Sequence, residues 1–77
     1  MTQDSAQRAV CSAVRAEMAR RRKTQADLAP VLGVTRQAVS RRLTGDVPLT
    51  VDELAAIADF LDVPVTQLLG GGVKAGA

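Results

Sequence analysis

Apolar residues recur at spacings of three and four along most of the chain, a pattern that is typical of amphipathic helices. Five stretches show it, at about residues 4–22, 25–32, 36–43, 50–61 and 64–69. The first is predicted to begin at Asp4 or Ser5, and its apolar stripe consists of Ala6, Val10, Ala13 or Val14, and Met18. We therefore predict an all-α chain of about five helices.

Polar residues at the starts of two stretches fit helix N-termini. Thr24 with Asp27, and Thr50 with Glu53, have the spacing of a capping box. In that arrangement the threonine hydroxyl and the acid three residues later each bond the other residue's backbone amide. Both positions are therefore predicted to begin a helix. Pro30 lies inside the first of these two helices, which we expect to be short or bent because proline lacks a backbone donor.

The second and third stretches read as a pair of short helices joined by a tight turn. Gly33 tolerates the left-handed conformation that ends a helix, Thr35 is suited to cap the next one, and Gly45 closes it. The buried face of the third stretch is expected to be Ala38, Val39 and Leu43, and the opposite face has Arg36, Gln37, Ser40 and Arg41 at helical spacing. A short helix that exposes arginine and glutamine beside a buried partner is what the reading of DNA base edges requires.

This helix pair resembles the helix-turn-helix of the phage repressor and Cro family of bacterial DNA-binding domains. The matching residues are Thr24-Gln25, Leu28-Ala29, Leu32-Gly33-Val34-Thr35, Val39-Ser40, Leu43, Gly45, Leu54, Ile57-Ala58, Leu61, Val63, Val65 and Leu68-Leu69. The resemblance covers residues 14–69 and implies a compact bundle of about five helices with a central helix-turn-helix. In one departure, Arg42 and Leu43 stand where many relatives have an apolar residue and then a glutamate.

The resemblance also implies where DNA is bound. In this family the N-terminal end of the second motif helix enters the major groove, so the helix at about 36–43 is expected to contact bases through Arg36, Gln37, Ser40 and Arg41. The expected phosphate contacts are Gln25, Thr35, Arg42, Thr44, Thr50, Arg21, Arg22 and Lys23. Structural alternatives stay open for several of them. The threonines suit caps and turns, Arg42 suits an intramolecular acid, and cations suit the end of the first helix.

Charge is distributed unevenly along the chain, although the net charge is only +2. From Arg15 to Arg42 eight basic residues face two acidic ones, which gives this part +6, whereas the part from Asp46 onward carries −4. A basic first half and an acidic second half indicate one surface directed at a polyanion. Next to a helix-turn-helix, the expected polyanion is double-stranded DNA.

Composition argues against several other classes of function. The 77 residues suffice for one small domain, assigned to residues 1–69, followed by a flexible C-terminal tail at 70–77. With no histidine and only Cys11 as a thiol, we expect no metal site, no cofactor and no catalytic constellation. No apolar run could span a membrane and no signal-peptide layout begins the chain, so we expect a cytoplasmic protein, associated with the bacterial nucleoid or phage-encoded.

The sequence thus favours a sequence-specific, double-stranded DNA-binding transcription regulator without enzyme activity, similar to a Cro-like or small immunity-type repressor. The alternative is an antitoxin-type or protein-interaction module with the same fold and a protein partner. Three apolar residues remain once the core is filled, and they are candidates for a weak homodimer or a DNA-assembled pair: Phe60, Val65 and Leu69. Whether Phe60 instead extends the core against the first helix stays open.

Overall fold

The computed structural model describes residues 2–69, with side chains from residue 6 onward. Five helices follow one another in this part of the chain: α1 (Thr2–Arg20), α2 (Gln25–Leu32), α3 (Arg36–Thr44), α4 (Val51–Leu61) and α5 (Val65–Leu69). Residues 2–69 contain no strand, and the predicted all-α fold with a helix-turn-helix at its centre is confirmed. The tail expected at 70–77 lies outside the described residues.

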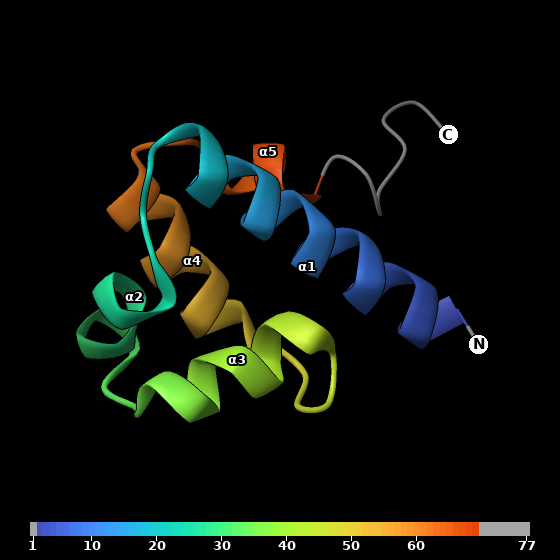
Figure 1. The fold of residues 1–77 in the computed structure, drawn as a ribbon. Helices are drawn as coiled ribbons and strands as arrows, with labels where there is room; N and C mark the ends of the chain where they lie inside the picture. The colour runs from blue at the N-terminus through green and yellow to red at the C-terminus, as the bar shows by residue number, and fades with distance from the viewer. Residues whose placement is uncertain (1, 70–77) are drawn as a thin grey trace.

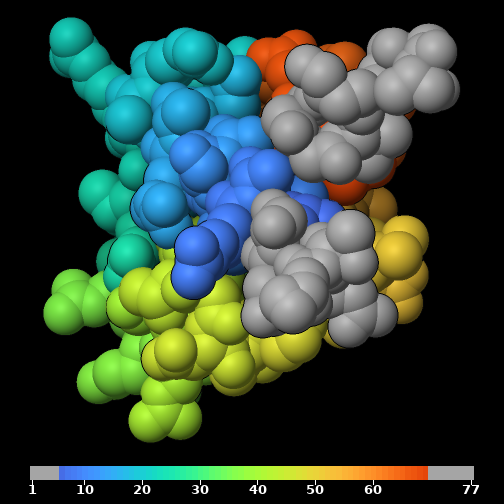
Figure 2. All heavy atoms as spheres, turned by 90° about the vertical axis from the view of Figure 1, so that its right-hand side faces the viewer, coloured from blue at the N-terminus to red at the C-terminus, as the bar shows by residue number. Residues whose placement is uncertain are grey.

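The helices enclose one apolar core, to which all five contribute. In Figure 1, α4 runs through the middle of the bundle, α3 lies along one edge and α1 crosses the opposite side. Figure 2 shows atoms of α1 between those of α3 and those of α5, and α1 contacts both helices. The most deeply buried core side chains are Val14, Leu28, Val39, Leu43, Ile57, Leu61 and Leu68. Burial of each such side chain is worth about 1.5–3 kcal/mol, which makes this core the main source of stability.

Four helices end in the same backbone arrangement. A residue with positive φ follows each helix, and the next amide bonds the carbonyl five positions back, as Lys23 N does to Met18 O at 2.9 Å. This is the Schellman motif. Glycine, which the sequence pattern signals, provides the positive φ after α2 and α3, but Arg22 and Asp62 provide it after α1 and α4. The left-handed Arg22 is why α1 ends at Arg20 and not at Arg22 as predicted.

The first helix differs from its prediction in two further respects. It begins at Thr2, earlier than Asp4 or Ser5, and Ala6 is exposed although it was placed on the buried stripe. In Figure 1 the N-terminal turns of α1 extend past the other helices, which accounts for the exposure of Ala6. Cys11 is buried with Val14 in the part of α1 that does cover the bundle.

Both predicted capping boxes are present and fix the starts of α2 and α4. Thr24 and Asp27 exchange backbone-to-side-chain bonds of 2.9 and 3.1 Å, and Thr50 and Glu53 exchange two of 3.1 Å. These bonds satisfy amides that have no partner inside the helix. Pro30 lies within α2, which is only eight residues long, as its presence predicted.

Candidate nucleic-acid interface

The helix-turn-helix consists of α2, the turn at Gly33 and α3. Thr35 caps α3 by accepting a 3.1 Å bond from the amide of Ala38. Val39 and Leu43 turn into the core, while Ala38 is only half-buried. The opposite face of α3 presents the side chains that the sequence predicted as base contacts: Arg36, Gln37 and Arg41 are exposed, and Ser40 is half-buried. The structure therefore places these four residues on one helix face.

Side chains of α1 hold the C-terminal end of α3. Cys11 Sγ donates to the carbonyl of Arg42 at 3.1 Å, and the guanidinium of Arg15 donates to the carbonyl of Leu43. Carbonyls at the end of a helix have no partner within it and carry partial negative charge, so a cation there is favourable. Burial raises the pKa of the Cys11 thiol, against a smaller lowering by Arg15, and keeps it protonated as a donor. These bonds fix the position of the C-terminal end of α3 relative to α1.

Arg42 is tied to α4. Its Nε donates to Glu53 Oε2 at 2.9 Å and its Nη1 donates to the carbonyl of Ala38 at 3.1 Å. The side chains of Arg42 and Glu53 are each 18% exposed. Of the two partners that the sequence left open for Arg42, this conformation shows the intramolecular acid.

Glu17, near the end of α1, is buried and collects several partners. It accepts bonds from Arg20 at 2.6 Å, from Arg21 and from Gln67 Nε2 at 2.8 Å, which joins α1 to α5. The Gln67 bond, followed by the arginines, lowers the pKa of Glu17 despite its burial. Arg21, expected at a phosphate, thus has a structural partner as well.

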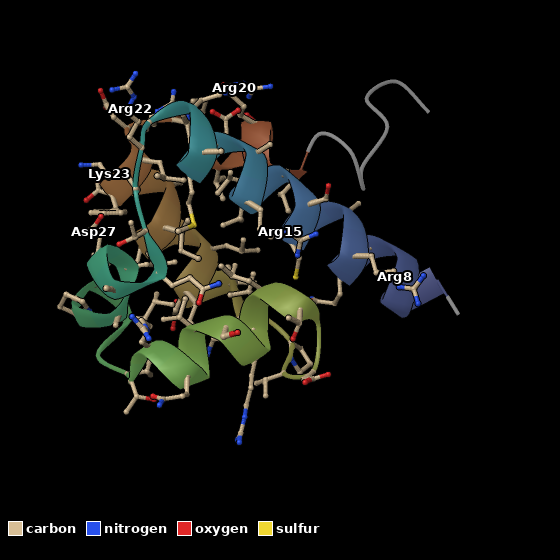
Figure 3. All side chains as sticks on the ribbon, in the orientation of Figure 1. Arg8, Arg15, Arg20, Arg22, Lys23 and Asp27 are labelled. Carbon is tan, nitrogen blue, oxygen red and sulfur yellow. The ribbon has the colours of Figure 1, made fainter. Side chains whose placement is uncertain are left out.

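The other two cations expected at phosphates lie in the turn after α1. Figure 3 shows Arg22 and Lys23 together at the end of α1, beside the start of α2. Both are exposed, and the Lys23 ammonium lies 5.3 Å from the centre of the Phe60 ring, within the range of a cation–π contact. Phe60 is half-buried and packs against the core.

The hydroxyls and the amide expected at phosphates differ in what they can still donate. Thr35 and Thr50 accept backbone amides as caps, so their hydroxyl protons remain available. Thr44 instead donates its hydroxyl to the carbonyl of Arg41 at 3.0 Å, which uses that proton. Gln25 is half-buried at the first position of α2. Thr35 and Thr50 therefore have a free hydroxyl proton to donate to a phosphate, whereas Thr44 does not.

Two basic residues that the sequence analysis did not assign to the site lie beside α3. Arg8, Cys11, Ser12 and Arg15 of α1 line a hollow against the end of α3. The i, i+4, i+7 spacing of Arg8, Ser12 and Arg15 was a signal that the sequence already contained. Figure 3 shows Arg8 and Arg15 along α1, away from the cluster of Arg20, Arg22 and Lys23.

The apolar residues proposed for pairing differ in exposure. Leu69 is half-buried and packs against the core, as Phe60 does, whereas Val65 is 38% exposed. Val51, at the start of α4, is 81% exposed and was not predicted. Among the described residues, no group of three or more side chains is arranged to hold a metal ion, and no helix is long and apolar enough to cross a membrane.

Two short helices joined by a left-handed glycine, with the polar face of the second one exposed, define a DNA-binding helix-turn-helix domain. A family profile described as helix-turn-helix matches residues 14–68. The chain belongs to this family, the Cro/C1-type helix-turn-helix DNA-binding regulators. Comparison with curated proteins and with solved structures gave no match. The first three turns of α1 precede the matched residues.

Proposed function

We propose that this protein is a sequence-specific regulator of transcription, of the Cro-like or small immunity-type repressor kind, that reads the major groove of double-stranded DNA with α3. One observation carries the proposal: the exposed face of α3 has no other engagement in the fold. The side chains of Arg36, Gln37 and Arg41 form no hydrogen bond or ion pair with any residue of the part of the chain that is described. Arg15, Arg20, Arg21 and Arg42, in contrast, all have intramolecular partners.

The chemistry of that face suits base edges. Arginine donates two parallel bonds to guanine O6 and N7, and glutamine exchanges two with adenine N6 and N7. Arg36 and Gln37 occupy the first turn of α3, which is the end that enters the groove, and Arg41 follows on the same face. Ser40 between them is small and half-buried, so it lets the helix approach the bases closely.

Phosphate contacts on either side of α3 set its register. We assign these contacts to Gln25, Thr35, Thr50, Arg22 and Lys23. Gln25 is the first residue of α2, and Thr35 and Thr50 cap α3 and α4. Arg21 and Thr44 contact a phosphate only when they release their intramolecular partners, Glu17 and the carbonyl of Arg41. Arg42 acts as a positioning residue that fixes α3 against α4.

One such motif reads about half of a site, so we propose that two copies bind an inverted repeat. We assign Val65, which is exposed, to the pairing surface together with the half-buried Phe60 and Leu69. This apolar surface is small, and pairing is accordingly expected on DNA more than in free solution. In this proposal residues 1–69 form the helix-turn-helix DNA-binding domain, the regulator acts in the cytoplasm, and it catalyses no reaction.

The test is selection of bound duplexes from a random DNA pool, followed by titration of the selected site and a scrambled duplex at several salt concentrations. We expect an enriched motif and a linear fall of log affinity with log salt, at about 0.9 per phosphate neutralised. Arg41→Ala should weaken binding and relax the preference at one base position, whereas Arg20→Ala, with the same loss of charge, should retain the preference. A protein that enriches no sequence would instead favour the antitoxin-type or protein-interaction alternative.

A further inference from the structure

The exposed face of α1 carries a polar row that the helix-turn-helix does not explain. Arg8, Ser12 and Arg15 are all exposed and recur at i, i+4 and i+7, which places them on one side of the helix. Arg8 and Ser12 precede residues 14–68, the part matched by the family. The row is therefore a feature of the extended first helix of this chain.

The row borders a groove between α1 and the C-terminal end of α3. Arg8, Cys11, Ser12, Arg15, Leu43 and Thr44 line it. None of these described lining residues is acidic, so the groove carries two positive charges. It adjoins a second hollow that Arg8 and Thr44 also line, and there Asp46 marks the end of the basic stretch. A groove lined by two arginines and no acidic residue attracts an anion.

The donors in the groove match a phosphodiester. Arg15 uses one guanidinium nitrogen for the carbonyl of Leu43, which leaves other N–H groups of its planar fork to donate. Arg8 provides a second guanidinium, and Ser12 adds a hydroxyl between them. Arginine forks bind phosphate oxygens through paired, charge-assisted bonds.

The groove is held at a fixed position relative to the reading helix. A neighbouring row on α1, Gln7, Cys11 and Arg15, bonds the backbone of α3 and of the loop after it. Gln7 Oε1 accepts the amide of Leu49 at 3.1 Å, Cys11 donates to the carbonyl of Arg42, and Arg15 donates to that of Leu43. An anion in the groove would thus stand in constant register with the bases under α3.

We propose that Arg8, Ser12 and Arg15 bind a phosphate of the DNA backbone beyond the bases that α3 reads. The inference rests on the proposed DNA-binding function and extends its footprint. The groove opens beside Thr44, the last residue of α3. Its position therefore suits a DNA phosphate that lies beyond the C-terminal end of the reading helix. The extended first helix would then add affinity that is independent of sequence.

The experiment compares Arg8→Ala with Arg20→Ala on the selected duplex. Both remove one exposed cation from α1, at opposite ends, and a urea titration verifies that each variant folds. Arg15→Ala is unsuitable because it also releases α3. We expect Arg8→Ala to weaken binding about tenfold at low salt, since it removes charge-assisted bonds, and to reduce the salt slope by about 0.9. Arg8→Lys should restore the slope but only part of the affinity, and Ser12→Glu should weaken binding at least as much as Arg8→Ala.

A second duplex separates this contact from those of α3. When the duplex is trimmed at its ends to the bases that α3 reads, the wild type should lose affinity and the difference between wild type and Arg8→Ala should vanish. The preferred sequence should be the same for all variants. Equal behaviour of Arg8→Ala and Arg20→Ala on the long duplex would overturn the inference while leaving DNA binding intact. Absence of binding by the wild type would instead overturn the proposed function itself.

Discussion

Arg42 of α3 and Glu53 of α4 are joined by a 2.9 Å bond from Nε to Oε2, and each also holds a backbone group of its own helix. Arg42 donates to the carbonyl of Ala38, and the second oxygen of Glu53 accepts the amide of Thr50 at the start of α4. One ion pair thus links the last turn of the reading helix to the cap of the next helix. The pair is largely shielded from water, so its loss leaves polar groups without partners.

Arg42→Ala is predicted to lower the free energy of unfolding by about 1–2 kcal/mol, because Glu53 and the Ala38 carbonyl lose their partner. The salt slope of DNA binding should stay unchanged, since Arg42 neutralises no phosphate. Arg41→Ala is the matched control on the same helix, and it should keep its urea midpoint while losing DNA affinity. An unchanged midpoint with a flatter salt slope for Arg42→Ala would show that Arg42 contacts a phosphate.

Arg36→Ala and Gln37→Ala are each predicted to weaken binding to the selected site by about 1–3 kcal/mol and to relax the preference at one base position. The physical reason is the loss of a two-bond contact with one base edge. Competition between the selected duplex and single-position variants measures the effect. Equal losses on the selected and scrambled duplexes would mean that these side chains touch only the backbone of DNA.

Gly33→Ala and Arg22→Gly are predicted to change stability in opposite directions. Both positions have a left-handed backbone at the same place in a Schellman motif, with φ of 68° and 55°. A methyl group at Gly33 would meet nothing within 4 Å, so the cost of Gly33→Ala is confined to the backbone and should be about 1 kcal/mol. Arg22→Gly should gain somewhat less, because glycine also makes the unfolded chain more flexible. Thermal unfolding should show shifts of opposite sign, and shifts of the same sign would contradict the assignment.

Glu17→Gln is predicted to make unfolding less sensitive to acid. The pKa of Glu17 in the folded protein lies below its ordinary value of 4.5, so ionised Glu17 stabilises the fold above that value. The contribution is lost as pH falls through the lower folded-state pKa. Urea midpoints should therefore show Glu17→Gln less stable than the wild type at pH 7, with a difference that shrinks below about pH 4.5. Asp59→Asn, which removes an exposed acid from α4, serves as the control and should follow the wild type.

Val65→Ser is predicted to reduce cooperative binding of two copies to an inverted repeat without changing affinity for a single half-site. Phe60 and Leu69 are poorer probes because they also pack against the core. Val51→Ser removes the same apolar atoms from an exposed position at the start of α4, and should leave cooperativity intact. Mass measurement of the complex gives the number of copies. A tight complex with one copy on an asymmetric site would contradict pairing.

Local signals in the sequence were enough to predict much of the fold. Caps at Thr24, Thr35 and Thr50 and glycines at 33 and 45 are short-range features, and their partners lie three to five residues away. The helix end that differs from its prediction is that of α1, where Arg22 adopts a positive φ that its side chain does not signal. Asp62 adopts the same conformation after α4, whose end at Leu61 was predicted.

Contacts between residues far apart in the chain could not be predicted from the spacing of apolar and polar residues. The partners of Glu17 include Gln67, fifty positions away, and Arg15 meets Leu43 across the bundle. Helical spacing placed Arg36, Gln37 and Arg41 on one face, but it could not show that Arg42 has an acid within reach on α4. The role of Arg42 was therefore left open by the sequence and depends on tertiary packing.

The bonds from α1 to the end of α3 are made to main-chain carbonyls, at Arg42 and Leu43, which every amino acid possesses. The outward residues of α3 take no part in this attachment. The residues at positions 36, 37 and 41 can consequently be substituted while α3 keeps its position against α1. A change of target sequence then requires no compensating substitution in the rest of the protein. The domain is in this respect a scaffold on which new DNA-binding specificities can evolve or be engineered.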